Sequence, residues 1–344
     1  MEALFAEAMK ATQALRKTSV PWAADQPYNQ PYYAYNPASS TWEPKTPTPS
    51  PTQDSTITKL VLYTWNIDFM LPFAAARMNP ALTHLSSFLT TLPTSTAPII
   101  FLQECTPSDL STIASTPWIR SRFHITDLTH EFWATEHYGT TILLDARLPV
   151  LSAFRVHFSN TRMDRDAFFV DTRINNKTTR LCNSHLESMA LDPPFRPPQV
   201  ALIASYLHSP AINAGITAGD FNAIQPFDRT LHSENNLKDA FLELGGKEDT
   251  EEAYTWGQQA PIVLRERFGL SRMDKVFFTG AVNVSRYERF GGGVLVEGEE
   301  EKKEIVKLGF EEAWVTDHLG VFVEIKVDTD AEITGEGVRR ESGL

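Results

Sequence analysis

Cysteine is scarce in this sequence, and long apolar runs are missing from it. The 344 residues include two cysteines, Cys105 and Cys182, which are too few to build a disulfide framework. Both lie in apolar, strand-like stretches, where buried free thiols are usual. No segment approaches the roughly 18 consecutive apolar residues of a membrane span. These absences exclude a disulfide-built secreted domain and a transmembrane protein, and they favour a reducing compartment.

Positive charge is also in the minority. The chain has 31 Lys and Arg residues against 43 Asp and Glu residues, which gives a formal net charge of −12. This balance argues against a protein that coats nucleic acid through bulk charge, although it leaves room for a local basic groove. Hydrophobic residues make up 42% of the chain, which excludes a wholly disordered protein and is enough for a large core.

The N-terminal residues do not have the pattern of a signal peptide. Glu2 and Glu7 interrupt the first 16 residues, which contain no apolar core segment. We therefore expect an intracellular protein, located in the nucleus or cytoplasm and not secreted. Apolar residues recur here at helical spacing and predict a short amphipathic helix that packs on the domain; they are Leu4, Ala8, Ala11 and Leu15.

Residues 21–54 change character. They hold eight of the chain's 22 prolines together with six aromatic residues. A proline-rich stretch is typical of extended chain, whereas disordered segments are usually poor in aromatics. We therefore predict that residues 1–57 form the N-terminal helix, then a Pro/Tyr-rich arm that packs on the domain, and then a loose linker near residues 45–56.

From residue 58 the sequence alternates between strand-like and helical patterns. The predicted strands are rich in Val, Ile, Phe and Thr and cover residues 59–65, 98–102, 138–145, 166–174, 179–184, 214–218, 273–279, 281–287 and 319–327. Predicted helices lie near residues 73–91, 107–116, 197–208 and 236–244. This mixture indicates one α/β catalytic domain over residues 58–327. The charged run at residues 297–304 predicts a solvated loop, and residues 328–344 a flexible acidic tail.

Polar residues follow several predicted strands, which is where α/β folds place their sites. Asn66 and Asp68 follow the first strand and lie on the same side of it, and Glu104 ends the second strand. Such oxygens can bind Mg²⁺, which takes one or two carboxylates together with water and substrate oxygens. The alternatives are a strand-to-loop turn for the first pair and a surface ion pair for Glu104.

Two further clusters carry a histidine and an acid. His185 lies between Ser184 and Ser188, and hydroxyls beside a histidine favour a phosphate or oxyanion site over a purely structural histidine. Asp220 and Asn222 follow a strand that ends in small residues. Aspartate can orient or deprotonate water, and asparagine can donate a hydrogen bond to a developing charge. The alternative for this cluster is an ordinary turn.

The last two clusters flank the C-terminal strands. Asp274 opens a strand between Arg272 and Lys275, where an ordinary ion pair is the alternative. Asp317 and His318 precede the final strand. A histidine beside an acid suggests a dyad, in which a carboxylate fixes the imidazole tautomer and stabilises its charged form. Chance supplies one such cluster at a strand end but not six in succession.

Taken in order, the six clusters resemble those of the endonuclease/exonuclease/phosphatase superfamily over nearly all of residues 58–327. Its members include deoxyribonuclease I, apurinic endonucleases, deadenylases, neutral sphingomyelinases and inositol polyphosphate 5-phosphatases. The resemblance implies a four-layered α/β/β/α sandwich with two packed mixed β-sheets. It also implies hydrolysis of a phosphodiester by water without a covalent intermediate, with Mg²⁺ as cofactor and Mn²⁺ able to substitute.

The resemblance implies a role for each acid on the metal side. Glu104 is the expected principal Mg²⁺ ligand, with Asn66 close to it. Asp68 is expected to support the metal from a second layer of contacts, and Asp317 to support it through water. A bound Mg²⁺ would bridge a phosphate oxygen and offset charge on the departing group.

The remaining residues take the catalytic roles that the resemblance implies. Asp220 is expected to orient or activate the attacking water. Asn222 and His185 are expected to donate hydrogen bonds to the non-bridging phosphate oxygens. His318, held by Asp274, is expected to donate to the phosphate or to assist proton transfer.

Within the superfamily the motifs are most similar to those of the tyrosyl-DNA phosphodiesterase 2 group. The segments TWNID and SHLES resemble that group, as do Tyr138 at the head of YGTTILL and Arg165 in RMDRDAFFVDT. Arg165 is a candidate phosphate clamp, with an ordinary surface arginine as the alternative, and Ser188 is a candidate substrate contact. Tyr138 and Trp256 are expected to stack on a base or to line the groove, with core packing as the alternative for both rings.

These similarities predict a Mg²⁺-dependent 5′-tyrosyl-DNA phosphodiesterase that acts in DNA repair. The expected partner is a single-stranded 5′ DNA end with a tyrosyl or peptide adduct, bound by a monomer without a membrane. A phenolate leaves readily because phenols have a pKa near 10. The alternatives are another phosphodiesterase (an RNA 3′-exonuclease or deadenylase, an apurinic endonuclease or a lipid phosphodiesterase) and a catalytically silent binding scaffold. The acidic net charge departs from the basic grooves of the DNA-binding members.

Overall fold

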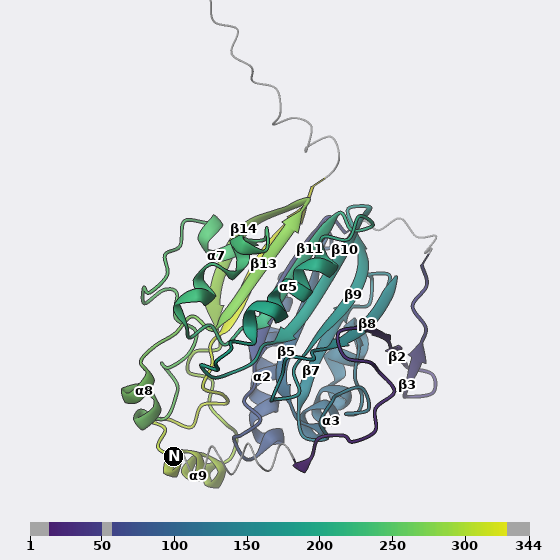
Figure 1. The fold of residues 1–344 in the computed structure, drawn as a ribbon. Coiled ribbons are helices and arrows are strands. Elements are labelled where there is room, and N and C mark those ends of the chain that lie inside the picture. The colour runs from purple at the N-terminus through teal and green to yellow at the C-terminus, as the bar shows by residue number, and fades with distance from the viewer. Residues whose placement is uncertain (1–13, 50–56, 329–344) are drawn as a thin grey trace, which may run out of the picture.

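Two β-sheets lie face to face at the centre of the protein. The computed structural model describes residues 14–49 and 57–328. Figure 1 shows the strands of the two sheets and the helices beside them. One sheet has seven strands, in the order β1 (Pro27–Asn29), β8 (Ser152–His157), β9 (Asp166–Ile174), β10 (Lys177–His185), β11 (Ala214–Asp220), β13 (Asp274–Gly280) and β12 (Lys238–Asp239). The other has eight, in the order β14 (Val282–Phe290), β15 (Gly320–Val327), β4 (Lys59–Asn66), β5 (Thr96–Cys105), β7 (Gly139–Asp145), β6 (Phe123–Ile125), β2 (Tyr32–Asn36) and β3 (Thr41–Lys45).

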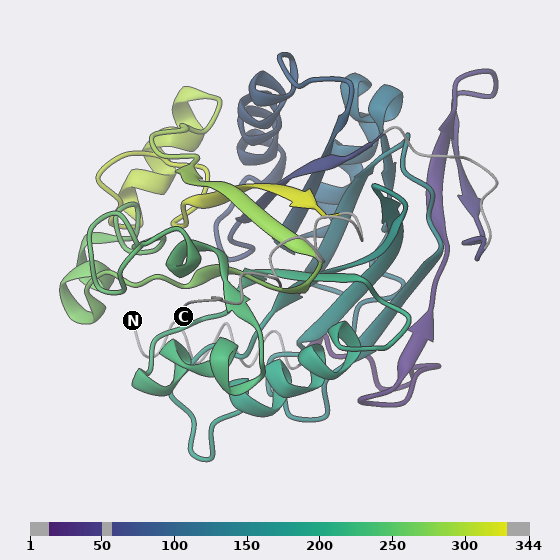
Figure 2. The ribbon, with the colours of Figure 1, turned by 90° about the horizontal axis from the view of Figure 1, so that it is seen from above.

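Helices cover the outer face of each sheet, so the domain has four layers. α2 (Ala74–Leu89) and α3 (Pro107–Ser115) pack on the eight-stranded sheet, and α5 (Arg196–Leu207) packs on the seven-stranded sheet. Figure 2 shows these two groups of helices on opposite sides of the sheets. A further apolar cluster, which includes Phe101 and Phe168, fills the space between the sheets. The arrangement confirms the predicted α/β/β/α sandwich of two mixed sheets.

The near-continuous apolar sequence of β4 follows from its central position. Leu60 and Leu62 point into the cluster between the sheets. Val61, Tyr63 and Trp65 point to the opposite side, into the cluster beneath α2. A strand that is buried on both faces has no solvent side, so polar residues do not alternate with apolar ones.

Strand pairing brings polar chain segments to one edge of the sandwich. β4 and β5 run parallel with Asn66 opposite Gln103, and β10 and β11 run parallel with His185 opposite Asp220. β13 runs antiparallel to β11, so its first residue, Asp274, also lies opposite Asp220. Residues that are far apart in the sequence therefore meet at the ends of these strands.

The Pro/Tyr-rich arm belongs to both sheets. β1 pairs with β8, β2 pairs with β6, and β3 pairs with β2. Proline is compatible with these strands because they lie at or next to sheet edges, where a missing backbone donor matters least. The arm therefore packs on the domain, as predicted, and it does so as strands of the two sheets. The predicted N-terminal helix up to residue 13, the linker residues 50–56 and the tail from residue 329 lie outside the described residues.

One predicted loop is a helix. Residues 299–307, in the charged run, form α9 (Glu299–Lys307). Its acidic first turn suits the positive end of the helix dipole, and Ile305 is fully buried. Three ion pairs at a spacing of three residues support it: Lys302–Glu299, Lys303–Glu300 and Lys307–Glu304.

The helices that sequence patterns did not separate are short: α4 (Pro117–Arg122), η1 (Pro226–Arg229), α6 (Leu231–Glu234) and α8 (Ile262–Phe268). The helix predicted near residues 236–244 is shorter than expected and forms α7 (Ala240–Glu243). None of the helices in the described part of the chain has the length and apolar character needed to cross a membrane. Both cysteines are buried and free.

A fully buried arginine links the two sheets. Arg155 of β8 forms ion pairs with Asp166 of β9 at 2.9 Å and with Asp127, which follows β6, at 3.1 Å. Its guanidinium also donates to Thr140 Oγ1 at 2.8 Å and to Gln30 Oε1 at 3.4 Å. Because a buried charge is costly unless it is paired and hydrogen-bonded, this network fixes how the sheets and the arm meet.

His157, two residues after Arg155, is a buried histidine without hydrogen bonds. Its ring stacks on Trp22 with centroids 4.0 Å apart, and neither ring nitrogen has a hydrogen-bond partner among the described residues. Burial, with the nearby positive charges of Arg155 and Lys17, lowers the pKa of His157 to about 2. The folded protein therefore keeps this ring neutral at acidic pH.

This burial predicts a loss of stability in acid. Below its ordinary pKa of 6.5 the histidine takes up a proton in the unfolded chain but not in the folded one. The free energy of unfolding therefore falls as the pH drops, and the contribution of this residue is about 2 kcal/mol between pH 7 and pH 5. His157→Phe keeps the ring stack and cannot be protonated. Urea titrations at both pH values should show that, from pH 7 to pH 5, the free energy of unfolding falls by about 2 kcal/mol less in the variant than in the parent.

The matched control is His208→Phe, which changes an exposed histidine at the end of α5. It should leave the pH dependence of unfolding as it is in the parent. An equal pH dependence in the parent and the His157→Phe variant would contradict the prediction.

Candidate active site

His318 lies among three carboxylates at the edge described above. Its Nδ1 is 2.9 Å from Asp274 Oδ2, and its Nε2 is 3.7 Å from Asp220 Oδ2 and 3.8 Å from Asp317 Oδ1. Burial alone would lower the pKa of His318, but the three carboxylates outweigh it and raise that pKa well above its ordinary value. The side chain is therefore a protonated imidazole whose Nε2–H faces the centre of the cluster.

Asp220 accepts hydrogen bonds from two asparagines that the sequence singled out. Asn66 Nδ2 donates to Asp220 Oδ2 at 2.9 Å, and the backbone N–H of Asn222 donates to Oδ1 at 2.8 Å. His185 Nε2 lies 3.3 Å from Oδ2. Burial alone would raise the pKa of Asp220, but His318 and His185 outweigh it and hold that pKa below its ordinary range. A fully buried aspartate therefore stays ionised.

Glu104 ends β5 with its backbone in the left-handed region, at φ 59°. Its Oε2 accepts from the backbone N–H of Phe69 at 2.9 Å, and its Oε1 faces His185 Nε2 at 3.6 Å. Burial, followed by repulsion from Asp317 and Glu104, raises the pKa of Asp68 well above its ordinary value. Burial also raises the pKa of Asp317, with Glu104 adding to the effect. Three acids thus crowd one side of the cluster.

This crowding suits a bound cation. Two sets of side chains place their candidate ligand atoms within 4.8 Å of one another, Glu104 with His185 and Asp220, and Asp220 with Asp274 and His318. In the second set His318 carries a proton that faces the carboxylates, which leaves no lone pair for a metal. The site near Glu104, with oxygen donors and excess negative charge, fits a hard divalent cation.

Asn66 is engaged on both sides of its amide. Its Nδ2 donates to Asp220, and its Oδ1 accepts from the backbone N–H of Asp68 at 2.8 Å. The structure thus brings all four residues of the predicted metal side, Glu104, Asn66, Asp68 and Asp317, to the same edge. It shows Asn66 as a hydrogen-bonded link between the metal side and Asp220.

Arg165 is buried beside His185 rather than exposed to solvent. Its Nη1 lies 2.6 Å from His185 Nδ1 and its Nη2 donates to Ser188 Oγ at 3.0 Å. Arginine can only donate, so Nδ1 accepts and the proton of the neutral ring sits on Nε2. Burial and the Arg165 charge lower the pKa of His185. The structure therefore rules out the alternative of an ordinary surface arginine and shows the guanidinium in contact with His185 and Ser188, while a role as phosphate clamp stays a prediction.

The two aromatic residues predicted to stack on a base are buried. Tyr138 is 4% exposed and its hydroxyl donates to the carbonyl of Met163 at 2.5 Å. Trp256 is 8% exposed and its indole N–H donates to Asp317 Oδ2 at 2.7 Å. The alternative of core packing therefore describes both rings. Trp256 orients a carboxylate on the metal side.

Three contributors to the site were missed from the sequence. Phe69 stacks on Tyr138 with centroids 4.1 Å apart and is partly exposed. Thr255 Oγ1 accepts from the backbone N–H of Asp274, and Thr316 Oγ1 donates to the carbonyl of Asn66. Each lies next to a motif residue, so proximity in sequence was the available signal.

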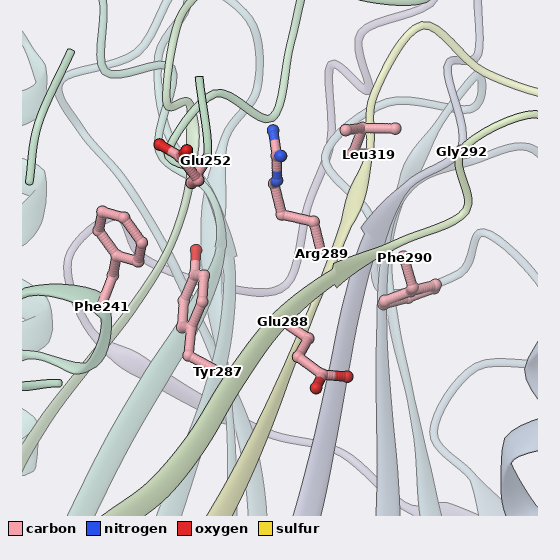
Figure 3. A pocket seen from close by; sticks show the side chains of 8 residues that line it. All are labelled: Phe241, Glu252, Tyr287, Glu288, Arg289, Phe290, Gly292 and Leu319. Atoms are coloured by element: carbon pink, nitrogen blue, oxygen red, sulfur yellow. The ribbon is translucent and has the colours of Figure 1, made fainter. Parts of the chain in front are cut away.

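A separate cavity of about 460 Å³ lies over β14. Figure 3 shows Tyr287 and Arg289 extending from this strand toward the loop with Glu252, while Glu288 points the other way. The Arg289 guanidinium donates to the backbone carbonyls of Glu251 and Tyr254. None of the predicted site residues lines this cavity, so it is distinct from the catalytic cluster.

Comparisons with known proteins agree with this fold and site. The model of the Endonuclease/Exonuclease/phosphatase family matches residues 63–318, which is more than half of the chain. No curated protein sequence matches the chain.

Solved structures with the same fold include two of TDP2 from D. rerio. A form humanized by 14 mutations has a TM-score of 0.60 at 18% identity, over 78% of this chain and 99% of that one. A complex with a single-strand DNA product has a TM-score of 0.59 at 19% identity, with the same coverage. The mannosyl-6-phosphatase Bt3783 of Bacteroides thetaiotaomicron has a TM-score of 0.56 at 15% identity, over 77% of this chain and 99% of that one.

These identities are low, so the structures support the fold, while the family model covers the motifs that build the cluster. The members of this family are metal-dependent hydrolases of phosphoester bonds, which is the chemistry that the crowded acids and the protonated histidine suit. The chain belongs to the Endonuclease/Exonuclease/phosphatase family.

Proposed function

We propose that this chain is a Mg²⁺-dependent phosphodiesterase that releases tyrosyl or peptide adducts from 5′ DNA ends during intracellular DNA repair. The observation that carries the hydrolytic chemistry is the buried cluster of Asp220, His318 and Asp274 beside Glu104. The proposed substrate follows from motifs similar to those of tyrosyl-DNA phosphodiesterase 2, which is abbreviated TDP2. The D. rerio structure with a single-strand DNA product supports a nucleic-acid substrate.

The cluster divides the catalytic work between an anion and two imidazoles. Asp220 is ionised and can orient a water for attack on phosphorus. His185 is neutral with its proton on Nε2 and can donate to a phosphate oxygen, as can the Asn222 amide. His318 is positively charged and held by Asp274 at 2.9 Å, so it can stabilise negative charge that develops on the phosphate.

Glu104 would hold Mg²⁺, with Asp68 and Asp317 beside it, and Mn²⁺ can occupy such a site. When bound, the metal supplies positive charge that stabilises the departing oxygen. The three acids would hold the cation, and Trp256 keeps Asp317 in place through the indole N–H. A phenolate needs little help from a general acid, because phenols have a pKa near 10.

The ring of Phe69 is positioned to contact the substrate. It is partly exposed, its backbone N–H donates to Glu104, and its ring rests on Tyr138. An aromatic face beside the metal side suits a phenol ring or a terminal base. We infer that Phe69 takes the stacking role that the sequence had suggested for Tyr138 and Trp256.

A second candidate is a phosphatase that acts on a small sugar phosphate. The structure of the Bacteroides mannosyl-6-phosphatase is similar to this chain at nearly the same TM-score as TDP2. The net charge of −12 also disfavours long contacts with a polyanion. Other family activities, on RNA 3′ ends, abasic DNA or lipid phosphodiesters, remain as further alternatives to be tested alongside it.

The first experiment measures cleavage of a single-stranded oligonucleotide with a 5′-phosphotyrosine, in Mg²⁺ and in EDTA. We expect release of a 5′-phosphate end that depends on Mg²⁺. His318→Ala should lower the rate by about 10²–10⁴, since it removes the charged donor. His208→Ala, which changes the exposed histidine directly after α5, is the matched control and should keep full activity.

Parallel assays separate the candidates. Cleavage of bis(p-nitrophenyl) phosphate without cleavage of the oligonucleotide would support phosphodiesterase activity and contradict the proposal that a DNA adduct is the substrate. Hydrolysis of mannose 6-phosphate alone would favour the sugar phosphatase. A protein that hydrolyses none of these substrates with Mg²⁺ or Mn²⁺ would support the silent scaffold.

Metal binding is predicted to show in thermal unfolding. A cation that binds the folded state alone stabilises it, by about 2.7 kcal/mol at 100 times the dissociation constant. Mg²⁺ should therefore raise the unfolding midpoint of the metal-free protein. Glu104→Gln should abolish this rise, yet be at least as stable without metal, because it removes one of three crowded negative charges.

The control for this measurement is Glu251→Gln, which changes an exposed glutamate away from the cluster and should respond to Mg²⁺ like the parent. A full Mg²⁺ response in Glu104→Gln would show that the cation sits elsewhere.

A further inference from the structure

We propose that the N-terminal strap, defined as residues 14–30, is a working part of the active site. It braces the connection between β8 and β9, residues 158–165, from the outside, and it thereby holds Arg165 against His185. The proposal rests on the proposed hydrolysis of a phosphodiester at this site, in which His185 donates from Nε2. Its central positioning residue is Arg16.

Arg16 anchors the first part of the strap to the end of the connection. Its Nε forms an ion pair with Asp164 Oδ1 at 2.6 Å, and its Nη2 donates to the carbonyl of Arg162 at 3.0 Å. Arg16 also forms an isolated β-bridge with Thr135. One side chain therefore ties the strap to the two residues that flank Met163, immediately before Arg165.

Neighbouring residues hold the strap in place against the segment that leads into Tyr138. The backbone N–H of Glu136 donates to the carbonyl of Leu15 at 3.1 Å, and the N–H of Lys17 donates to the carbonyl of Ala134 at 3.0 Å. Lys17 Nζ adds hydrogen bonds to two backbone carbonyls of the same segment. Arg16 is thus presented from a fixed backbone.

The second part of the strap holds the start of the connection. Trp22 stacks on His157. The backbone N–H of Asp25 donates to the carbonyl of His157, and Asp25 Oδ1 accepts from the backbone N–H of Ser159, both at 2.8 Å. The strap therefore contacts both ends of the connection. The side of the connection that faces the active site is free for other contacts.

The inner face of the connection is held by Glu187, which lies between the site residues His185 and Ser188 in the sequence. Glu187 accepts from Thr161 Oγ1 at 2.7 Å and from the backbone N–H of Arg162 at 3.1 Å. Thr161 Oγ1 in turn accepts from the backbone N–H of Arg165 at 3.0 Å. The connection is thus clamped between the site and the strap.

Loss of the ion pair between Arg16 and Asp164 would affect His185 through the neighbouring Arg165. Asp164 is a non-glycine residue at φ 57°, and its side chain is only 6% exposed in its pair with Arg16. Without that partner a buried carboxylate is left uncompensated and is driven toward water. Asp164 precedes Arg165, so the movement would draw the guanidinium away from His185 Nδ1 and release the tautomer that it fixes.

The test compares Arg16→Ala and Arg16→Lys with the full-length parent, using bis(p-nitrophenyl) phosphate and the 5′-phosphotyrosyl oligonucleotide. Arg16→Ala should lower kcat about 10- to 100-fold, as expected when a partner behind an active group is lost, with a smaller change in KM. Arg16→Lys keeps the charge and should recover much of kcat. Arg286→Ala removes a comparable surface arginine paired with Glu288 on β14 and should retain parental kcat.

A spectroscopic readout does not depend on turnover. In protein labelled with ¹⁵N-histidine, the two ring nitrogens of His185, assigned with His185→Gln, should have the shifts of a ring protonated on Nε2. Arg16→Ala should move them toward a mixture of tautomers at unchanged pH. Trp22→Ala loosens the strap at a second point and should move them in the same direction.

Unchanged kcat and unchanged His185 nitrogen shifts in Arg16→Ala would overturn the proposal. Shifts that move in a protein inactive on every substrate would support the strap and reject the proposed function. A fall in kcat shared equally by Arg286→Ala would overturn the proposal, because the effect would then be one of general charge or stability.

Discussion

The buried carboxylate of Asp220 is the group on which the active site depends. An amide, a backbone N–H and two imidazoles approach it, from β4, from its own turn, from β10 and from the segment before β15. An ionised aspartate with little exposure is stable only if such donors are present. Each of them occupies its place because a strand end delivers it there, so the pairing of the strands and the charge of Asp220 support each other.

Two histidines near this carboxylate differ in charge because their second partners differ. Arg165 faces the far nitrogen of His185, and together with burial it keeps that ring neutral. Asp274 faces the far nitrogen of His318, and with the neighbouring acids it keeps that ring charged. One site thereby holds a neutral donor and a cationic donor a few ångströms from the same anion. Acid–base sites need such a difference in protonation state between neighbouring groups.

Much of the fold could be predicted from the sequence, because the central strands are buried on both faces and appear as unbroken apolar runs. The motif residues could be singled out as well, because six polar clusters follow strands in succession, although each cluster alone fits an ordinary turn or ion pair. The partners of these residues could not. Arg165 looks like any surface arginine, and its burial beside His185 comes from the β9–β10 pairing and from long-range contacts. The burial of Tyr138 and Trp256 is likewise a tertiary effect.

The charged run that forms α9 was misjudged, and the strands of the Pro/Tyr-rich arm were missed although the packing of the arm on the domain was predicted. Local composition favoured a loop and an extended arm, but ion pairs along one helix face stabilise α9, and free strand edges recruit the arm. Composition describes what a segment does in isolation. These two segments take their structure from neighbours that composition does not include, and this explains why the sequence did not show their helix and strands.

The position of the arm has a practical consequence for work with truncated fragments of this protein. β1 covers the outer edge of β8, and β2 with β3 covers the outer edge of β6. A fragment trimmed to the family motifs would keep every catalytic side chain yet leave backbone donors and acceptors of both sheets open to solvent. Open edges template pairing between copies, so such a fragment would be prone to self-association in expression and crystallisation. By covering these edges, the arm helps to keep the protein soluble.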